Sequence, residues 1–212
     1  MNSTIDATTM ALALSELSQK SLLINNIVST LGSPPLWRRE PGFSSLVYTI
    51  LEQQVSLASA KAAYDKLLRA VGTLTPETFL RLDDSELRLA GFSRQKTNYC
   101  RILSHQIVRR ELDLVALNDK SDDDIRDALT AVKGIGKWTA NIYLLHSLGR
   151  PDVWPTGDLA LRVAAMEILG MEDRPSEQQL QTLGDEFRPW RSVAARVFWH
   201  SYLSKRGISE VS

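Results

Sequence analysis

The stretch that decides the fold is Leu129–Ala165, with the sequence LTAVKGIGKWTANIYLLHSLGRPDVWPTGDLALRVAA. Apolar residues recur at helical spacing on both sides of the short segment VKGIG, residues 132–136. Two glycines around one aliphatic residue allow a tight turn with positive φ, and they keep side chains away from the backbone amides. The segment therefore predicts a hairpin between two helices, suited to binding the phosphate backbone of one DNA strand without reading its sequence.

The residues around the turn fit this interpretation. Lys133 and Lys137 flank it and would add positive charge, while Ile135 would anchor the hairpin in the core. A purely structural helix–turn–helix is the alternative, because a glycine turn alone is common. A phosphate-binding P-loop does not fit, since Trp138 stands where a Ser or Thr would ligate magnesium.

Helical periodicity also dominates the rest of the chain. Helices are predicted at residues 43–71 (one or two), after Thr75, and at 85–90, 95–111, 122–131, 138–148, 159–169, 175–183 and 193–203. Residues 24–31 carry some β-branched character and offer only a weak strand. The expected fold class is all-α, built from many short helices.

Composition sets further bounds. Among 212 residues, 25 basic and 25 acidic side chains cancel, so any polyanion site must come from local segregation of charge. Residues 91–110 are basic without any acid, although a solvated face explains such a run equally well. The single Cys100 excludes a disulfide framework and a four-cysteine cluster.

No apolar run approaches the roughly 20 residues of a membrane span, and the N-terminus lacks the basic region of a signal peptide. We therefore expect no membrane partner and an intracellular protein, cytoplasmic in a bacterium or nuclear in a eukaryote.

The chain resembles the helix-hairpin-helix DNA glycosylases, and within them the 3-methyladenine DNA glycosylase II branch. The hairpin VKGIGKWTAN (132–141) and the loop RPDVWPTGD (150–158), ending at Asp158, carry the match. The segment ILEQQVS (50–56) resembles the helix that enters the minor groove, and residues 188–192 and 197–199 resemble the C-terminal helix. The similarity covers roughly residues 40–205.

This resemblance implies a two-lobed helical bundle with a helix-hairpin-helix motif and a cleft between the lobes. The central lobe would span about 55–165, and the second lobe would combine about 1–54 with 166–212. The implied partner is double-stranded DNA containing alkylated bases, bound by a monomer. Bifunctional members carry a catalytic lysine where this chain has Trp138, so the expected enzyme is a monofunctional glycosylase without lyase activity.

Asp158 is the expected catalytic residue. An alkylated purine is cationic and leaves as a neutral base, so no general acid is needed. One carboxylate can then stabilise the oxocarbenium-like sugar and activate water. Because Asp158 precedes a predicted helix, N-capping is the alternative role, and the two roles are compatible.

Aromatic side chains are candidates for the pocket of a flipped cationic base. The resemblance implies Trp138 and Trp199, whereas Trp154 is inferred from its closeness to Asp158, and Tyr48 from its position one turn before Gln53. Core packing is the alternative for each tryptophan.

The resemblance also implies the residues that contact DNA. Gln54 matches the wedge that fills the gap left by the flipped base, and Gln53 would contact the bases or backbone beside it; the alternative is an exposed helix face. The implied hairpin contacts are Lys133, Gly134, Gly136, Lys137 and Thr139. A structural monovalent cation would bind the carbonyl groups of Thr130, Val132 and Ile135, and no cofactor is expected for catalysis. The three histidines show no metal-binding spacing and are interpreted as structural or surface residues.

Two rival functions stay open. The first is a glycosylase that hydrolyses the same bond but removes uracil, mismatched or deaminated bases. These bases are neutral leaving groups, so their release would require an added hydrogen-bond donor. The second is a non-catalytic protein that binds DNA lesions. A carboxylate beside phosphate disfavours the second, because it would only weaken binding.

Overall fold

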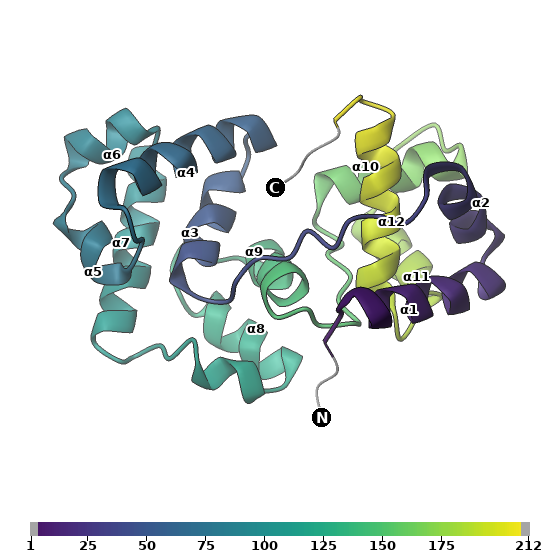
Figure 1. Ribbon diagram of the computed structural model, residues 1–212, viewed down its shortest axis with the longest axis horizontal. Helices are drawn as coiled ribbons and strands as arrows, with labels where there is room; N and C mark the ends of the chain where they lie inside the picture. The colour runs from purple at the N-terminus through teal and green to yellow at the C-terminus, as the bar shows by residue number, and fades with distance from the viewer. Residues whose placement is uncertain (1–3, 209–212) are drawn as a thin grey trace. The chain divides into compact units, whose positions relative to one another are not determined.

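The computed structural model describes residues 4–208, and the all-α expectation is confirmed, since regular structure in that range is helical throughout (Figure 1). The helices are α1 (Ala7–Lys20), α2 (Leu22–Leu31), α3 (Phe43–Glu52), α4 (Leu57–Val71), α5 (Pro76–Arg81), α6 (Asp84–Ala90), α7 (Arg94–Val108), α8 (Asp122–Thr130), α9 (Lys137–Ile142), α10 (Leu159–Leu169), α11 (Glu177–Asp185) and α12 (Arg191–Ser204). A 3₁₀ turn covers Ala116–Asp119, and a π-helical turn covers Tyr143–Ser147.

The chain forms two compact units. Residues 39–143 form the first, here called the hairpin unit, and residues 1–38 with 144–212 form the second, here called the Asp158 unit. These boundaries differ from the lobes expected from the sequence. Helix α3 belongs to the hairpin unit because it packs on α4 and α7, whereas α10 belongs to the Asp158 unit because it packs on α12.

The hairpin unit contains α3 to α9 (Figure 1). Its core includes an aromatic row in which Phe79 contacts both Phe43 and Phe92, at ring-centroid distances of 6.1 and 5.7 Å. Helices α3 and α7 pack on each other, and α3 also contacts α9. The start of α9 is therefore supported by a packed core.

The Asp158 unit is built around α12, the yellow helix of Figure 1, which contacts α1, α2, α10 and α11. Residues 192–199 of this helix are all buried. They include Arg196, whose guanidinium donates to the carbonyl groups of Leu36, Leu145 and Ser192 at 2.9 Å each. Burial lowers the pKa of Arg196 below its usual value, and the three carbonyl groups partly replace the lost hydration.

Two segments differ from the sequence-based expectation. Residues 24–31 are helical, so the weak strand was wrong: the Ser21 hydroxyl caps α2, and Ile24 is fully buried, so packing overrides β-branched propensity. The helix predicted at 138–148 ends at Ile142 and continues as the π turn, which shifts the register of the residues that follow.

Among the described residues, no helix combines the length and apolar character that crossing a bilayer requires.

Candidate active site and nucleic-acid interface

Asp158 is the N-cap of α10. Its Oδ1 accepts the backbone N–H of Leu161 at 2.7 Å, and Arg162 donates its N–H to the Asp158 carbonyl at 3.0 Å. The side chain thus lies at the positive end of the helix dipole, which favours a negative charge there. The residue is buried but retains 8% exposure. Capping is therefore observed, and it orients the carboxylate without sealing it from solvent.

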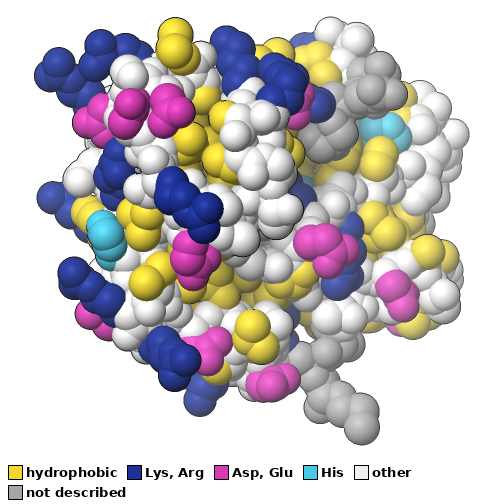
Figure 2. Space-filling view, turned by 60° about the vertical axis from the view of Figure 1, so that its left-hand side comes forward, with side chains coloured by type: hydrophobic (Ala, Val, Ile, Leu, Met, Phe, Trp, Pro, Cys, Tyr) yellow, Lys and Arg dark blue, Asp and Glu magenta, His cyan; other side chains and the backbone are white. Residues whose placement is uncertain are grey.

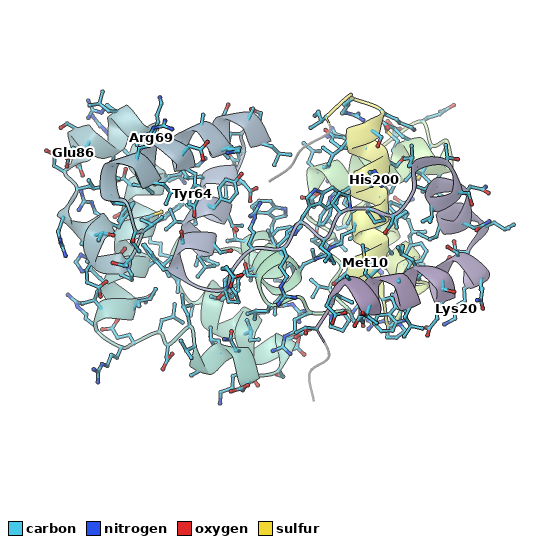
Figure 3. All side chains as sticks on the ribbon, in the orientation of Figure 1. Met10, Lys20, Tyr64, Arg69, Glu86 and His200 are labelled. Carbon is cyan, nitrogen blue, oxygen red and sulfur yellow. The ribbon has the colours of Figure 1, made fainter. Side chains whose placement is uncertain are left out.

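Trp199 is joined to Asp158 by a hydrogen bond. Its Nε1–H donates to Asp158 Oδ1 at 3.0 Å. Trp199 lies on α12, immediately before His200 (labelled in Figure 3), and retains 7% exposure. An indole and a carboxylate are thereby fixed together within one unit.

The VKGIG segment forms the predicted hairpin between α8 and α9 in the other unit. Val132 and Ile135 are buried, and the N–H of Ile135 donates to the Val132 carbonyl at 3.0 Å. Lys133, Gly136 and Lys137 are exposed, and no atom lies within 4 Å of the position that a Gly136 Cβ would take. The backbone at the start of α9 is therefore open to a phosphate group.

Gly134 is required by both its backbone and its neighbour. Its φ is +99°, and a Cβ at this position would lie 2.1 Å from Cγ of Tyr99 on α7. On the same helix, Lys96 Nζ donates to the Leu51 carbonyl at the end of α3, at 2.7 Å. Helix α7 therefore supports both the hairpin and the end of α3.

Gln53 and Gln54 follow α3 and have different environments. Gln53 donates its amide N–H groups to the Gly134 carbonyl and to Thr139 Oγ1, both at 3.0 Å. Gln54 is exposed and adopts a left-handed conformation with φ +57°. The apolar Val55 and Leu57 beside it are also exposed. This loop exposes Gln54 next to apolar side chains, and its role as the wedge stays a prediction.

Comparison with known proteins places these features in one family. The family model described as HhH-GPD superfamily base excision DNA repair protein matches residues 47–189, which include the Gln54 loop, the hairpin and Asp158. The chain belongs to the HhH-GPD superfamily.

Relatives within this superfamily agree with that assignment. The putative DNA-3-methyladenine glycosylase YfjP of Bacillus subtilis is 29% identical over 167 residues, covering 75% of this chain and 58% of that protein. The chain thus spans less than two thirds of the length of that relative. DNA-3-methyladenine glycosylase 1 of Schizosaccharomyces pombe is 26% identical over 166 residues, covering 76% of this chain and 72% of that protein.

Two solved structures share the fold. A DNA-3-methyladenine glycosidase from Bacillus halodurans is 30% identical, with a TM-score of 0.74, covering 97% of this chain and 94% of that one. The S. pombe glycosylase Mag1, solved in complex with abasic DNA, has a TM-score of 0.84 at 23% identity, covering 92% of this chain and 96% of that one.

In this HhH-GPD protein, Gln53 and Thr139 also have a structural role inside the hairpin unit. Both were predicted to contact DNA. The Gln53 amide nitrogen is hydrogen-bonded to the hairpin, and Thr139 is 1% exposed, while their contacts with DNA stay predictions. They connect α3 to α9, so that the Gln54 loop and the hairpin are held in one arrangement.

Two of the predicted pocket residues lie in the packed interior. Trp154 contacts Phe187 and Phe198, and its Nε1–H donates to the Leu180 carbonyl at 2.8 Å. Its indole also lies against Gly184, where a Cβ would be 2.4 Å from the ring. Trp154 is therefore packed in the core of the Asp158 unit, and its predicted pocket role stays a prediction.

Tyr48 is also packed. Its ring stacks on Tyr64 (labelled in Figure 3) at 4.6 Å, and the Arg39 guanidinium lies 4.4 Å from its centroid. Arg39 is held there by a bidentate ion pair with Glu52. Burial, followed by the charge of Glu52, raises the pKa of the Tyr48 hydroxyl. Its ring contributes to packing, and its pocket role stays a prediction. Trp138, on α9, is half-buried, and its pocket role stays a prediction.

Sequence reasoning missed the residues that support the site. His146 stacks on Trp199, with ring centroids 5.5 Å apart and planes at 21°. Tyr99 and Lys96 support the hairpin and α3 from α7. No sequence pattern marked His146, because its partners are far away along the chain: the Trp37 carbonyl lies 109 positions before it, and Trp199 lies on another helix.

Surface charge is mixed on the face that Figure 2 draws. Figure 2 shows Lys and Arg side chains distributed among Asp and Glu over the face that it draws. In the basic segment 91–110, Arg101 pairs with Asp84 at 2.7 Å, and desolvation lowers the pKa of Lys96. With a formal net charge of zero, the whole-molecule field does not favour a polyanion, so a contact with one would depend on local groups.

The two adjacent glutamines provide a test of the brace between α3 and the hairpin, which consists of the two hydrogen bonds that Gln53 donates to Gly134 and Thr139. Gln53→Ala removes both bonds and leaves a carbonyl and a buried hydroxyl without their donor, so we expect the free energy of unfolding to fall by about 1–3 kcal/mol. Gln54→Ala changes an exposed side chain and should stay within about 0.5 kcal/mol of the parent. Urea unfolding followed by circular dichroism measures both. Equal losses in the two variants would contradict the brace.

Proposed function

We propose that this protein is a monofunctional DNA glycosylase that hydrolyses the N-glycosidic bond of alkylated purines of the 3-methyladenine type, the first step of base excision repair. The hydrogen bond between Trp199 Nε1 and Asp158 Oδ1 is the observation that carries the proposal. It fixes an electron-rich ring beside a carboxylate at a helix N-terminus. The names of the relatives, DNA-3-methyladenine glycosylases from bacteria and yeast, support the same substrate class.

The binding step in this proposal uses the hairpin unit. The exposed amides at the start of α9, with Lys133 and Lys137, contact the phosphates of one strand. Gln54 enters the space left by the flipped nucleotide, and its polar end pairs with the widowed base. The left-handed conformation of Gln54 is costly for a residue with a side chain, as expected where function imposes the geometry.

The chemical step uses the Asp158 unit. A purine alkylated at N3 or N7 is cationic, and it is attracted to the face of the Trp199 indole by about 0.5–2 kcal/mol. The bond between C1′ and the base breaks, and the electron pair leaves with the base, which becomes neutral. Asp158 stabilises the positive charge that develops on the sugar and accepts a proton from the water that attacks C1′.

A cation at the hairpin belongs to this proposal. The carbonyl groups of Thr130, Val132 and Ile135 are the oxygen donors that would hold it. The Val132 carbonyl accepts the Ile135 N–H and retains a second lone pair, so the donor set suits a weakly bound monovalent ion. Such an ion would link the turn to a phosphate group and take no part in the reaction.

The role of Asp158 is tested by Asp158→Asn. Asparagine retains an oxygen that can cap α10 and accept from Trp199, but it lacks the negative charge. Release of free bases from methylated duplex DNA, separated by chromatography, should fall by roughly 10²–10³-fold or more, with binding to an abasic-site duplex preserved.

Asp6→Asn is the matched control, because Asp6 caps α1 through the same bond to a backbone N–H, at 2.7 Å, in the same unit. It should excise at the parental rate. Excision by Asp158→Asn at the parental rate would remove Asp158 from catalysis. A parent protein that releases uracil or hypoxanthine but no methylated base would support the first rival function, and one that binds lesions without releasing any base would support the second.

The hairpin contact is tested by the double variant Lys133→Ala with Lys137→Ala. Its affinity for duplex DNA should fall for all sequences, and the slope of log K against log salt should decrease by roughly one unit per lost phosphate contact. Lys61→Ala is the control, because Lys61 lies on α4 and pairs with Asp65 at 2.9 Å. An unchanged slope in the double variant would exclude both lysines from the interface.

The absence of lyase chemistry is tested by borohydride trapping. A bifunctional glycosylase forms a Schiff base through its lysine, and reduction makes that adduct permanent. Trp138 has no amine, so we expect no covalent protein–DNA adduct on denaturing gels, with an endonuclease III as the positive control. A trapped adduct would contradict the monofunctional assignment.

A further inference from the structure

His146 contacts both Trp199 and the segment of residues 32–38 that follows α2, here called the strap. Its ring stacks on Trp199, and its Nδ1 lies 2.8 Å from the Trp37 carbonyl oxygen. A carbonyl only accepts hydrogen bonds, so Nδ1 carries the proton. His146 therefore contacts a backbone group through its edge and the Trp199 indole through its face.

The Trp199 indole is fixed from two directions. Its edge is tied to Asp158 at the start of α10, and one face is covered by His146 from the π turn. A hydrogen bond at the edge alone would let the ring tilt about the Nε1–Oδ1 direction, and a stacked neighbour removes that freedom. A base that stacks on Trp199 must consequently use the face opposite His146.

The groups that hold His146 are themselves anchored. Arg196 donates to the carbonyl of Leu36, next to Trp37, and to that of Leu145, next to His146. Trp37 has a φ of +45°, a conformation that persists only where its surroundings enforce it. One buried guanidinium thus fixes both backbone segments between which the imidazole lies.

We propose that His146 is a positioning residue: it sets the plane of Trp199, so that the indole presents one face to the damaged base and keeps its bond to Asp158. The consequence for excision rests on the proposed glycosylase function. The consequence for Trp199 does not, because it concerns the protein without DNA.

Two substitutions separate the two contacts of His146. His146→Asn keeps an N–H donor near the position of Nδ1 and removes the ring. His146→Phe keeps an aromatic ring on Trp199 and removes the donor to Trp37. His146→Leu is the control for volume, because Leu fills a similar space without an aromatic ring. A residue that only fills space would be replaced by Leu as well as by Phe, whereas the stacking role predicts that His146→Leu behaves like His146→Asn.

The first experiment observes Trp199 directly. The indole N–H signals are recorded by ¹H–¹⁵N NMR, with Trp199 assigned from its absence in Trp199→Phe. In the parent and in His146→Phe, the Trp199 signal should show the downfield shift and slow solvent exchange of an N–H group that donates a hydrogen bond to a carboxylate. In His146→Asn it should move upfield and exchange faster. An unchanged signal in His146→Asn overturns the proposal whatever the enzyme does to DNA.

The second experiment measures single-turnover release of methylated bases. We expect about a three- to tenfold lower rate for His146→Asn, the size of one lost aromatic pair, with unchanged affinity for abasic-site duplex. In a double-mutant cycle with Trp199→Phe, the combined loss should be smaller than the product of the single losses, since His146 acts through Trp199. Multiplicative losses, or a parental rate in His146→Asn, overturn the proposal. A parent that releases no base overturns the proposed function instead and leaves the NMR result to decide on His146.

Discussion

The hydrogen bond between the Trp199 indole and the Asp158 carboxylate is the interaction on which the site depends. It is made by a residue in the middle of α12 and a residue that caps α10, and these two helices pack on each other. The caps, the dipole of α10 and the buried face of α12 all serve to place these two side chains. A carboxylate oriented by two N–H donors is ready to stabilise positive charge without reorganisation, which is the largest contribution that most active sites make.

The support for this pair comes from a buried polar network rather than from apolar packing alone. Arg196 is among the largest fully buried side chains, and its three carbonyl contacts hold the strap, the π turn and its own helix. Removing one partner from such a network leaves a buried polar group unsatisfied and is costly, so the network defines one geometry. His146, between two of the anchored segments, receives its orientation from it.

The sequence was sufficient for features encoded locally. The VKGIG turn and the capping role of Asp158 each depend on a few neighbouring residues, and Trp199 came from the resemblance. The roles of Gln53, Thr139, Trp154 and His146 could not be predicted in the same way. Whether Gln53 faces DNA or the protein depends on a carbonyl 81 positions away along the chain. Trp154 is close to Asp158 in sequence, but its indole donates to the Leu180 carbonyl and packs against Phe187 and Phe198.

The fit of Gly134 against the ring of Tyr99 has a consequence for how the hairpin binds. Gly134 packs against the Tyr99 ring and its carbonyl accepts from Gln53, so in the proposed function the turn would have its binding conformation before DNA arrives. Its conformational entropy is lost during folding rather than during association, which is the advantage of preorganisation. A preorganised hairpin of this kind would bind each segment of the DNA backbone briefly and dissociate without changing its own conformation. The search for damage requires this, because many undamaged nucleotides are met for each damaged one.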